Sequence, residues 1–249
     1  MKFLATSLSK FSRPVGGLLV LASLLAAQPT FAQETSLLQT QFKAASLEQA
    51  KREPSGLRAA ANASWRKMLT ELGQGLGPGA VPEGFPFDVK EFSQLQSASL
   101  GLAFEVNTTS PQKLAASNIP LEKMLQGNGI WNFVIMVKDR PVALLEMAKI
   151  DGRWQAQGAG GAKLAQDVYQ AAQSHGGKSA FRFVRIYQAT ADLLEVQDSQ
   201  ANARYVPLVA ARESLQMDKL QAGTSLSGQD VLPSLQEAVR KNLAAQAPR

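Results

Sequence analysis

The sequence predicts an α+β fold, in which a helical N-terminal region precedes an antiparallel sheet packed with one or two helices. Residues 33–72 repeat apolar side chains at helical spacing. Runs of β-forming residues then follow one another, three before a helix and three after it. Consecutive strands favour antiparallel pairing, whereas a parallel sheet needs a regular alternation of strand and helix.

Residues 1–32 have the features of a secretory leader. Three basic residues precede a 13-residue apolar run at positions 15–27. Thr30-Phe31-Ala32 then supplies the small residues that signal peptidase needs, which predicts cleavage before Gln33. The alternative is a transmembrane anchor, but a spanning helix takes about 20 residues. We therefore expect an exported protein, in the periplasm or outside the cell.

The charge of the remaining chain is small. The leader holds three of the 26 Lys and Arg and none of the 20 Asp and Glu, so its removal lowers the net charge from +6 to +3. A net charge of this size favours solubility and does not indicate a nucleic-acid partner. The mature chain has no second apolar stretch of membrane-spanning length, so we expect it to be soluble.

Residues 33–72 are predicted to form two helices. Trp65, Met68, Leu69 and Leu72 lie on one helical face, and Pro54-Ser55-Gly56 separates this helix from an earlier one. We expect the helices to pack on the main domain. The alternative is an arm that binds a partner.

Residues 73–86 are predicted to be a linker. They contain five Gly and three Pro in fourteen positions, a composition that disfavours both helix and central strand. The domain boundary would then lie here, with an α+β domain at 87–226. The alternative is a long surface loop within one domain.

The α+β domain is predicted to open with a strand at 99–108. Two short helices follow, at 111–116 and 120–126, and Gly127-Asn128-Gly129 is expected to stop the second. Strands at 130–138, 142–150 and 153–157 then form a meander, with a first turn at 139–141. Asp151-Gly152 makes the second turn, because a type I′ turn needs positive φ at both central positions.

After the meander, the sequence predicts one helix, three strands and a C-terminal helix. A helix over 162–174 ends at His175-Gly176-Gly177. Three strands follow at 181–187, 193–197 and 205–210. A C-terminal helix and tail occupy 227–249.

The composition excludes several kinds of site. The chain has no Cys, so it has no disulfide, no thiolate nucleophile and no cysteine metal ligand. His175 is the single histidine, and its place at a helix end, where positive charge is favoured, indicates a structural role. We expect no metal, no cofactor and no catalytic residues of the Ser-His-Asp type.

Glu146 is the one carboxylate that stands out. It lies inside an apolar strand, between Leu145 and Met147. A buried Glu at this position would have a raised pKa and could act as an acid. The alternative is that the strand has one wet face and Glu146 points into solvent with a cross-strand partner.

Gly158-Ala159-Gly160-Gly161-Ala162-Lys163 begins a helix after a strand, where phosphate-binding loops occur. Its spacing matches neither the P-loop nor the dinucleotide-binding pattern. We expect a tight strand-to-helix turn instead.

Four residues are candidates for ligand binding. Arg182 and Arg185 alternate with aromatic residues along a strand, which would suit an anionic or polysaccharide ligand. Trp131 and Trp154 lie in neighbouring predicted strands and either line a groove or belong to the core. An ordinary half-buried strand is the alternative for the arginines.

These features predict a non-catalytic binding or accessory protein of the bacterial envelope or extracellular space. Its partner would be a protein or an envelope component. The alternative is a carboxylate-dependent hydrolase that acts on a glycan of the same compartment, with Glu146 as the first residue to test.

Overall fold

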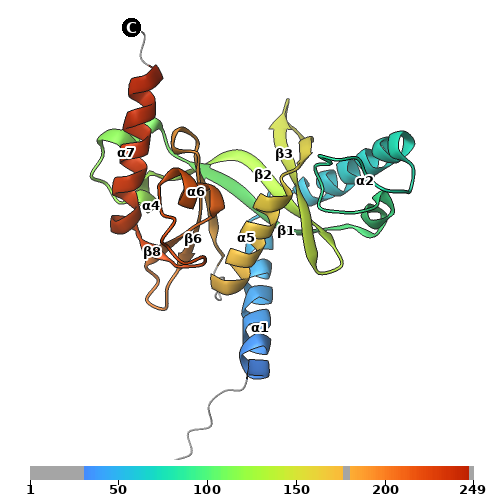
Figure 1. The fold of residues 1–249 in the computed structure, drawn as a ribbon, viewed down its shortest axis with the longest axis horizontal. Coiled ribbons are helices and arrows are strands. Elements are labelled where there is room, and N and C mark those ends of the chain that lie inside the picture. Colours follow the sequence, from blue (N-terminus) through green and yellow to red (C-terminus); the bar gives the residue numbers. More distant parts are fainter. Residues whose placement is uncertain (1–30, 176–179, 247–249) are drawn as a thin grey trace, which may run out of the picture.

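Eight strands form one mixed sheet in the order β4-β3-β2-β1-β5-β6-β7-β8, and helices cover both of its faces (Figure 1). The computed structural model describes residues 31–175 and 180–246. Helices at the N-terminal side precede this sheet, which confirms the predicted α+β class. The pairing is antiparallel throughout the described sheet except between β1 and β5.

Two helices begin the described chain, α1 (Phe31–Ala50) and α2 (Leu57–Leu76). Most of the predicted leader lies outside the described residues, and α1 contains its last two positions. α2 buries Leu57, Ala61 and Trp65, which repeat every four residues and so share one face. The Phe42 ring of α1 meets Tyr169 edge-on at 5.0 Å between centroids. Both helices therefore pack on the body of the protein.

The end of α2 differs from the prediction, because residues 73–76 are helical although they contain two glycines. A Cβ atom at Gly73 would lie 3.1 Å from the Phe92 ring, so this glycine allows α2 to approach η1 (Phe92–Ser97) closely. The segment between α2 and η1 packs against α2 and the sheet. Phe87 is buried 5.8 Å from the Trp65 ring, and the Asp88 N–H donates to the Val142 carbonyl at 2.9 Å.

Four strands form the first half of the sheet: β1 (Ser99–Thr108), β2 (Gln126–Val137), β3 (Arg140–Ile150) and β4 (Arg153–Gly160). The predicted second turn is present, since φ is positive at both Asp151 and Gly152. It pairs Ile150 with Arg153 and Lys149 with Trp154. The first turn lies earlier than expected, because β3 already begins at Arg140.

Two short helices, α3 (Pro111–Ala116) and α4 (Leu121–Met124), connect β1 to β2. Gly127-Asn128-Gly129 was expected to stop the second, but these residues belong to β2. The Glu105 carboxylate lies over Gly127, where a Cβ atom would come within 2.3 Å of its Oε1 atom. It also accepts a hydrogen bond from the Gly129 N–H at 3.3 Å. Gly127 thus makes room for a cross-strand side chain, a role that local turn rules do not reveal, whereas Gly129 has a positive φ.

After α5 (Ala162–His175), four strands form the second half of the sheet: β5 (Arg182–Ile186), β6 (Ala191–Gln197), β7 (Ala203–Pro207) and β8 (Leu226–Ser227). The helices of this part of the chain are η2 (Tyr187–Ala189), α6 (Val209–Ser214) and α7 (Gly228–Gln246). The strand predicted over 205–210 ends at Pro207, and α6 begins two residues later. Strand β8 has two residues, too few for a detectable alternation.

The helices divide the core into three parts. On one face of the sheet, α2 covers the first half and α7, with α3 and α4, covers the second. On the opposite face, α5 packs across both halves. There Phe104 of β1 lies 5.0 Å from Phe183 of β5, between ring centroids. We call the two sides the α2/α7 face and the α5 face.

Candidate functional site

The predicted binding residues do not gather at one place. Trp131 is buried beneath α2 on the α2/α7 face, and Trp154 packs half-buried against the same cluster. Arg182 and Arg185 are three positions apart in β5, so their side chains emerge on opposite faces. Arg182 and Arg185 consequently line two separate pockets.

Arg182 lines a pocket of about 580 Å³ at the β8 end of the sheet, which we call the edge pocket. Its walls come from the α3–α4 connection, β6, the start of β7 and the first turn of α7. The polar side chains in it include Asn118, Glu122, Arg182, Glu195, Asn202 and Gln229. This volume is within the range of sites that hold drug-sized ligands.

An ion pair fixes the base of the edge pocket. Arg182 and Glu195 face each other across β5 and β6. The Arg182 guanidinium donates from Nε to Oε1 at 2.9 Å, and from one terminal nitrogen to Oε1 at 2.6 Å and Oε2 at 2.7 Å. The Glu195 side chain is only 10 % exposed. Burial raises the pKa of Glu195, and the contacts with Arg182 oppose that rise.

Tyr205 lies next to Glu195 in the adjacent strand and is fully buried. Its hydroxyl lies near the Glu195 carboxylate and helps to lower the pKa of that acid. Burial, followed by the negative charge of Glu195, raises the pKa of Tyr205 well above its ordinary value. The phenol is therefore neutral and does not act as a base at physiological pH.

Arg185 lines a smaller pocket of about 270 Å³ on the α5 face, which we call the central pocket. Glu146 of β3 lines the same pocket, so these two candidates do come together. The Arg185 guanidinium donates to both oxygens of Asp192, at 2.7 and 2.8 Å, and lies 5.3 Å from the Phe183 ring centre. Hydrogen bonds to Asp192 raise the pKa of Arg185, and Glu146 contributes a smaller electrostatic effect.

Glu146 is half-buried, so it is neither enclosed in the core nor fully in solvent, which were the two predicted environments. Its cross-strand neighbours are Asn132 on β2 and Gly158 on β4. Among the described residues, no hydrogen bond or ion pair engages its carboxylate. Gly158 to Gly161 pass from β4 into α5 and form one wall of the pocket. The sequence predicts that the strand ends at Gln157 and that a turn follows, but β4 continues to Gly160, so only Gly161 connects it to α5.

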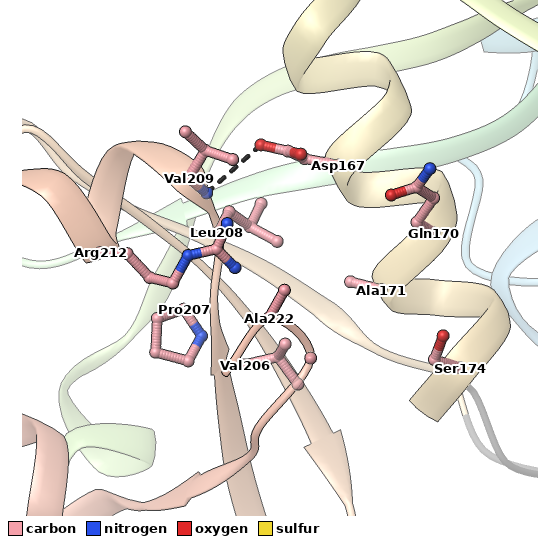
Figure 2. A pocket seen from close by; sticks show the side chains of 11 residues that line it. Asp167, Gln170, Ala171, Ser174, Val206, Pro207, Leu208, Val209, Arg212 and Ala222 are labelled. Carbon is pink, nitrogen blue, oxygen red and sulfur yellow. Dashed lines mark hydrogen bonds between the residues drawn. The ribbon is translucent and has the colours of Figure 1, made fainter. Parts of the chain in front are cut away.

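A third pocket, about 180 Å³, lies between α5 and α6 (Figure 2). Asp167 of α5 points across it toward α6 and accepts a hydrogen bond from the Val209 N–H at 3.2 Å. Burial raises the pKa of Asp167, while the Val209 hydrogen bond and the charge of Arg212 lower it. Asp167 therefore caps a helix that belongs to another part of the chain, a structural use of a carboxylate.

The spacing of charged residues in the sequence already indicates the two ion pairs. Arg182 and Arg185 are three residues apart, as are Asp192 and Glu195. An antiparallel hairpin that pairs the first Arg with the last acid also pairs the inner two. No comparable signal marks Glu122, Asn202 or Gln229, which reach the edge pocket from three separate elements or loops.

Comparisons with known proteins add no functional assignment. No protein-family model, no curated protein and no solved structure matches the chain. Within the described residues, no helix has both the length and the apolar character needed to cross a bilayer.

Proposed function

We propose that this chain is an exported, non-catalytic binding protein of the bacterial envelope or extracellular space, and that its edge pocket holds an extended segment of a partner polypeptide. The observation that carries the proposal is the edge pocket itself. It combines a large volume with polar side chains whose charged pair, Arg182 and Glu195, is already fixed by its own hydrogen bonds.

The chemistry of the walls favours a polypeptide. Amide side chains such as Asn118, Asn202 and Gln229 can both donate to and accept from peptide groups. The pocket also lies at β8, the last strand of the sheet, and β8 is only two residues long. Sheet edges offer unpaired backbone groups to extended peptides, and neighbouring pockets then supply specificity.

The fixed ion pair favours binding over catalysis. Both oxygens of Glu195 accept hydrogen bonds from Arg182, so neither is free to attack a substrate while this ion pair is intact. A Ser-His-Asp site would need His175, which lies at the C-terminal end of α5 and does not line the edge pocket. The proposal of export rests on the leader-like residues 1–32.

A peptide-display selection tests the proposal. We expect the purified chain to enrich peptides that bind it in fluorescence anisotropy. Gln229→Trp, an exposed change at the pocket wall, should weaken binding at least tenfold, or about 1.4 kcal/mol. Gln246→Trp is the matched control at the far end of α7 and should leave affinity unchanged. Absence of enriched peptides, or equal binding by the Gln229 variant, would refute the assignment.

One observation favours glycan hydrolysis as a second candidate: Glu122 and Glu195 line the same pocket, and paired carboxylates perform this reaction. The central pocket offers Glu146 no second carboxylate among its lining residues. Release of reducing sugar from envelope glycans, abolished by either Glu122→Gln or Glu195→Gln, would establish the hydrolase. Under the binding proposal, the wild-type chain releases none.

A further inference from the structure

The central pocket contains a buried polar group that the fold itself does not use. Asn132 is only 5 % exposed, and its side chain lines the pocket from β2. No described residue forms a hydrogen bond with its amide, and the amide atoms are not among the fully enclosed unpaired atoms, so they are accessible from the pocket. A ligand in the pocket would therefore be able to hydrogen-bond to this amide.

Groups that attract cations and groups that attract anions both line the pocket with this amide. Glu146, the cross-strand neighbour of Asn132, forms no ion pair or hydrogen bond with a described residue, although its charge acts on Arg185 in the same pocket. The first turn of α5 begins at Ala162 and contributes Leu164 to the wall. The first N–H groups of a helix lack intrahelical acceptors, and its dipole favours an anion there. Since Ala165 is the first to donate within α5, to the Gly161 carbonyl at 3.0 Å, the earlier N–H groups remain available.

The guanidinium of Arg185 adds a donor of fixed position. Its bonds to Asp192 use Nε and one terminal nitrogen, which leaves the other terminal nitrogen without a partner among the described residues. The Arg185–Asp192 pair is neutral as a unit. The pocket thus carries one negative group without an ion pair, Glu146, and the start of a helix also lines it.

We infer that the central pocket binds a free α-amino acid. The ammonium group would pair with Glu146, the carboxylate would accept hydrogen bonds from the start of α5 and from Arg185, and the Asn132 amide would bridge the two. Leu144 and Leu164 offer an apolar wall to the side chain. A volume of about 270 Å³ lies below the range of drug-sized sites, as expected for so small a ligand.

The ligand arm of the test uses three compounds and isothermal titration of the full chain. L-leucine carries both charges, N-acetyl-L-leucine lacks the ammonium, and L-leucinamide lacks the carboxylate. We expect L-leucine to bind and each analogue to bind at least tenfold more weakly, because one charged contact is lost. Absence of L-leucine binding at millimolar concentration, or equal binding by either analogue, would overturn the inference.

The protein arm uses Gly158→Leu. A Cβ atom at Gly158 would meet nothing within 4 Å, and Gly158 lies opposite Glu146 in the lining of the pocket, so a larger side chain there takes up space in the pocket. Gly79→Leu is the matched control, since a Cβ atom there also meets open space and Gly79 does not line the pocket. We expect Gly158→Leu to lose L-leucine binding and Gly79→Leu to keep it.

Glu146→Gln provides an isosteric second variant, which keeps the volume and removes the charge. It should weaken the binding of L-leucine at least tenfold and leave the affinity for N-acetyl-L-leucine unchanged. A purely structural role of Glu146 would not produce this difference. Retention of full affinity by this variant would also overturn the inference. Peptide binding at the edge pocket is a separate measurement, so either proposal can fail without the other.

Discussion

Arg182 and Glu195 show how one pair of residues can stabilise the fold and shape a binding site at the same time. The carboxylate is nearly buried, so its charge is tolerated only because three hydrogen bonds from the guanidinium compensate for lost water. The same bonds hold both side chains in one orientation at the base of the edge pocket. Removing one partner should therefore affect stability more than removing both.

We predict that Arg182→Met lowers the free energy of unfolding by about 3 kcal/mol at pH 7, because it leaves Glu195 buried and unpaired. The pKa of Glu195 is already raised and would rise further without Arg182. Protonation then removes the unpaired charge, so the deficit should shrink as the pH falls toward the unfolded-state pKa, about 4.3.

Urea denaturation at pH 7 and pH 4.5 measures this deficit. The double variant Arg182→Met, Glu195→Gln serves as the control, since it carries no buried charge and should recover most of the stability at pH 7. A deficit that is independent of pH, or a double variant no more stable than the single one, would show that the ion pair has no such role.

At the scale of elements, Asp167 links two helices that are far apart in sequence. Its carboxylate on α5 caps the first turn of α6 (Figure 2). We predict that Asp167→Ala costs about 1 kcal/mol, the usual value of a lost cap, and that Asp167→Asn costs less because the amide keeps an acceptor.

The pH dependence of this cost has a definite sign. Burial raises the pKa of Asp167 in the folded state. Its stabilising contribution is thus largest below the unfolded pKa, about 3.9, and falls as the pH rises through the folded value. The wild type should exceed Asp167→Ala by more at pH 4 than at pH 7 in thermal unfolding. A larger difference at pH 7 would contradict the assigned direction.

Most elements were predictable because their signals are local. Asp151-Gly152 fixes its turn through backbone conformation, and the α5 stripe around Ala165 and Val168 follows from helical periodicity. The misassigned glycines depend on distant atoms. Gly127 makes room for Glu105, and Gly160 lies against Pro86, with 3.2 Å between its expected Cβ and that ring. Neither contact can be read from neighbouring residues.

The candidate sites were less predictable for the same reason. Glu146 and Arg185 were singled out individually, yet only the tertiary fold brings them into one pocket. Trp131 and Trp154 are of a residue type that often lines grooves, but in the structure both belong to the cluster that α2 covers. The parallel contact between β1 and β5 was also missed, because it depends on α5 crossing the sheet rather than on any strand sequence.

For the molecule as a whole, the two halves of the sheet meet along β1 and β5 and beneath α5. The parallel register is short, with Val106 opposite Phe183 and Asn107 opposite Val184. Phe104 is fully buried and contacts Phe181 and Phe183, at 6.4 and 5.0 Å between centroids. Cooperative folding of both halves should depend on this aromatic cluster.

We predict that Phe104→Ala destabilises the protein by about 3–5 kcal/mol and separates unfolding into two calorimetric transitions. Phe133→Ala is the matched control, because Phe133 is equally buried but belongs to the cluster beneath α2. It should cost a similar amount and keep one transition. A single transition in the Phe104 variant would mean that other contacts couple the halves.

Amide hydrogen exchange shows whether the edge pocket receives an extended polypeptide. Exchange would be followed with and without a peptide obtained from the display selection. We predict slower exchange in residues 197–205 and 226–229, which surround the pocket, and no change in α1. Unchanged exchange around the pocket, or slowing confined to another region, would contradict the claim.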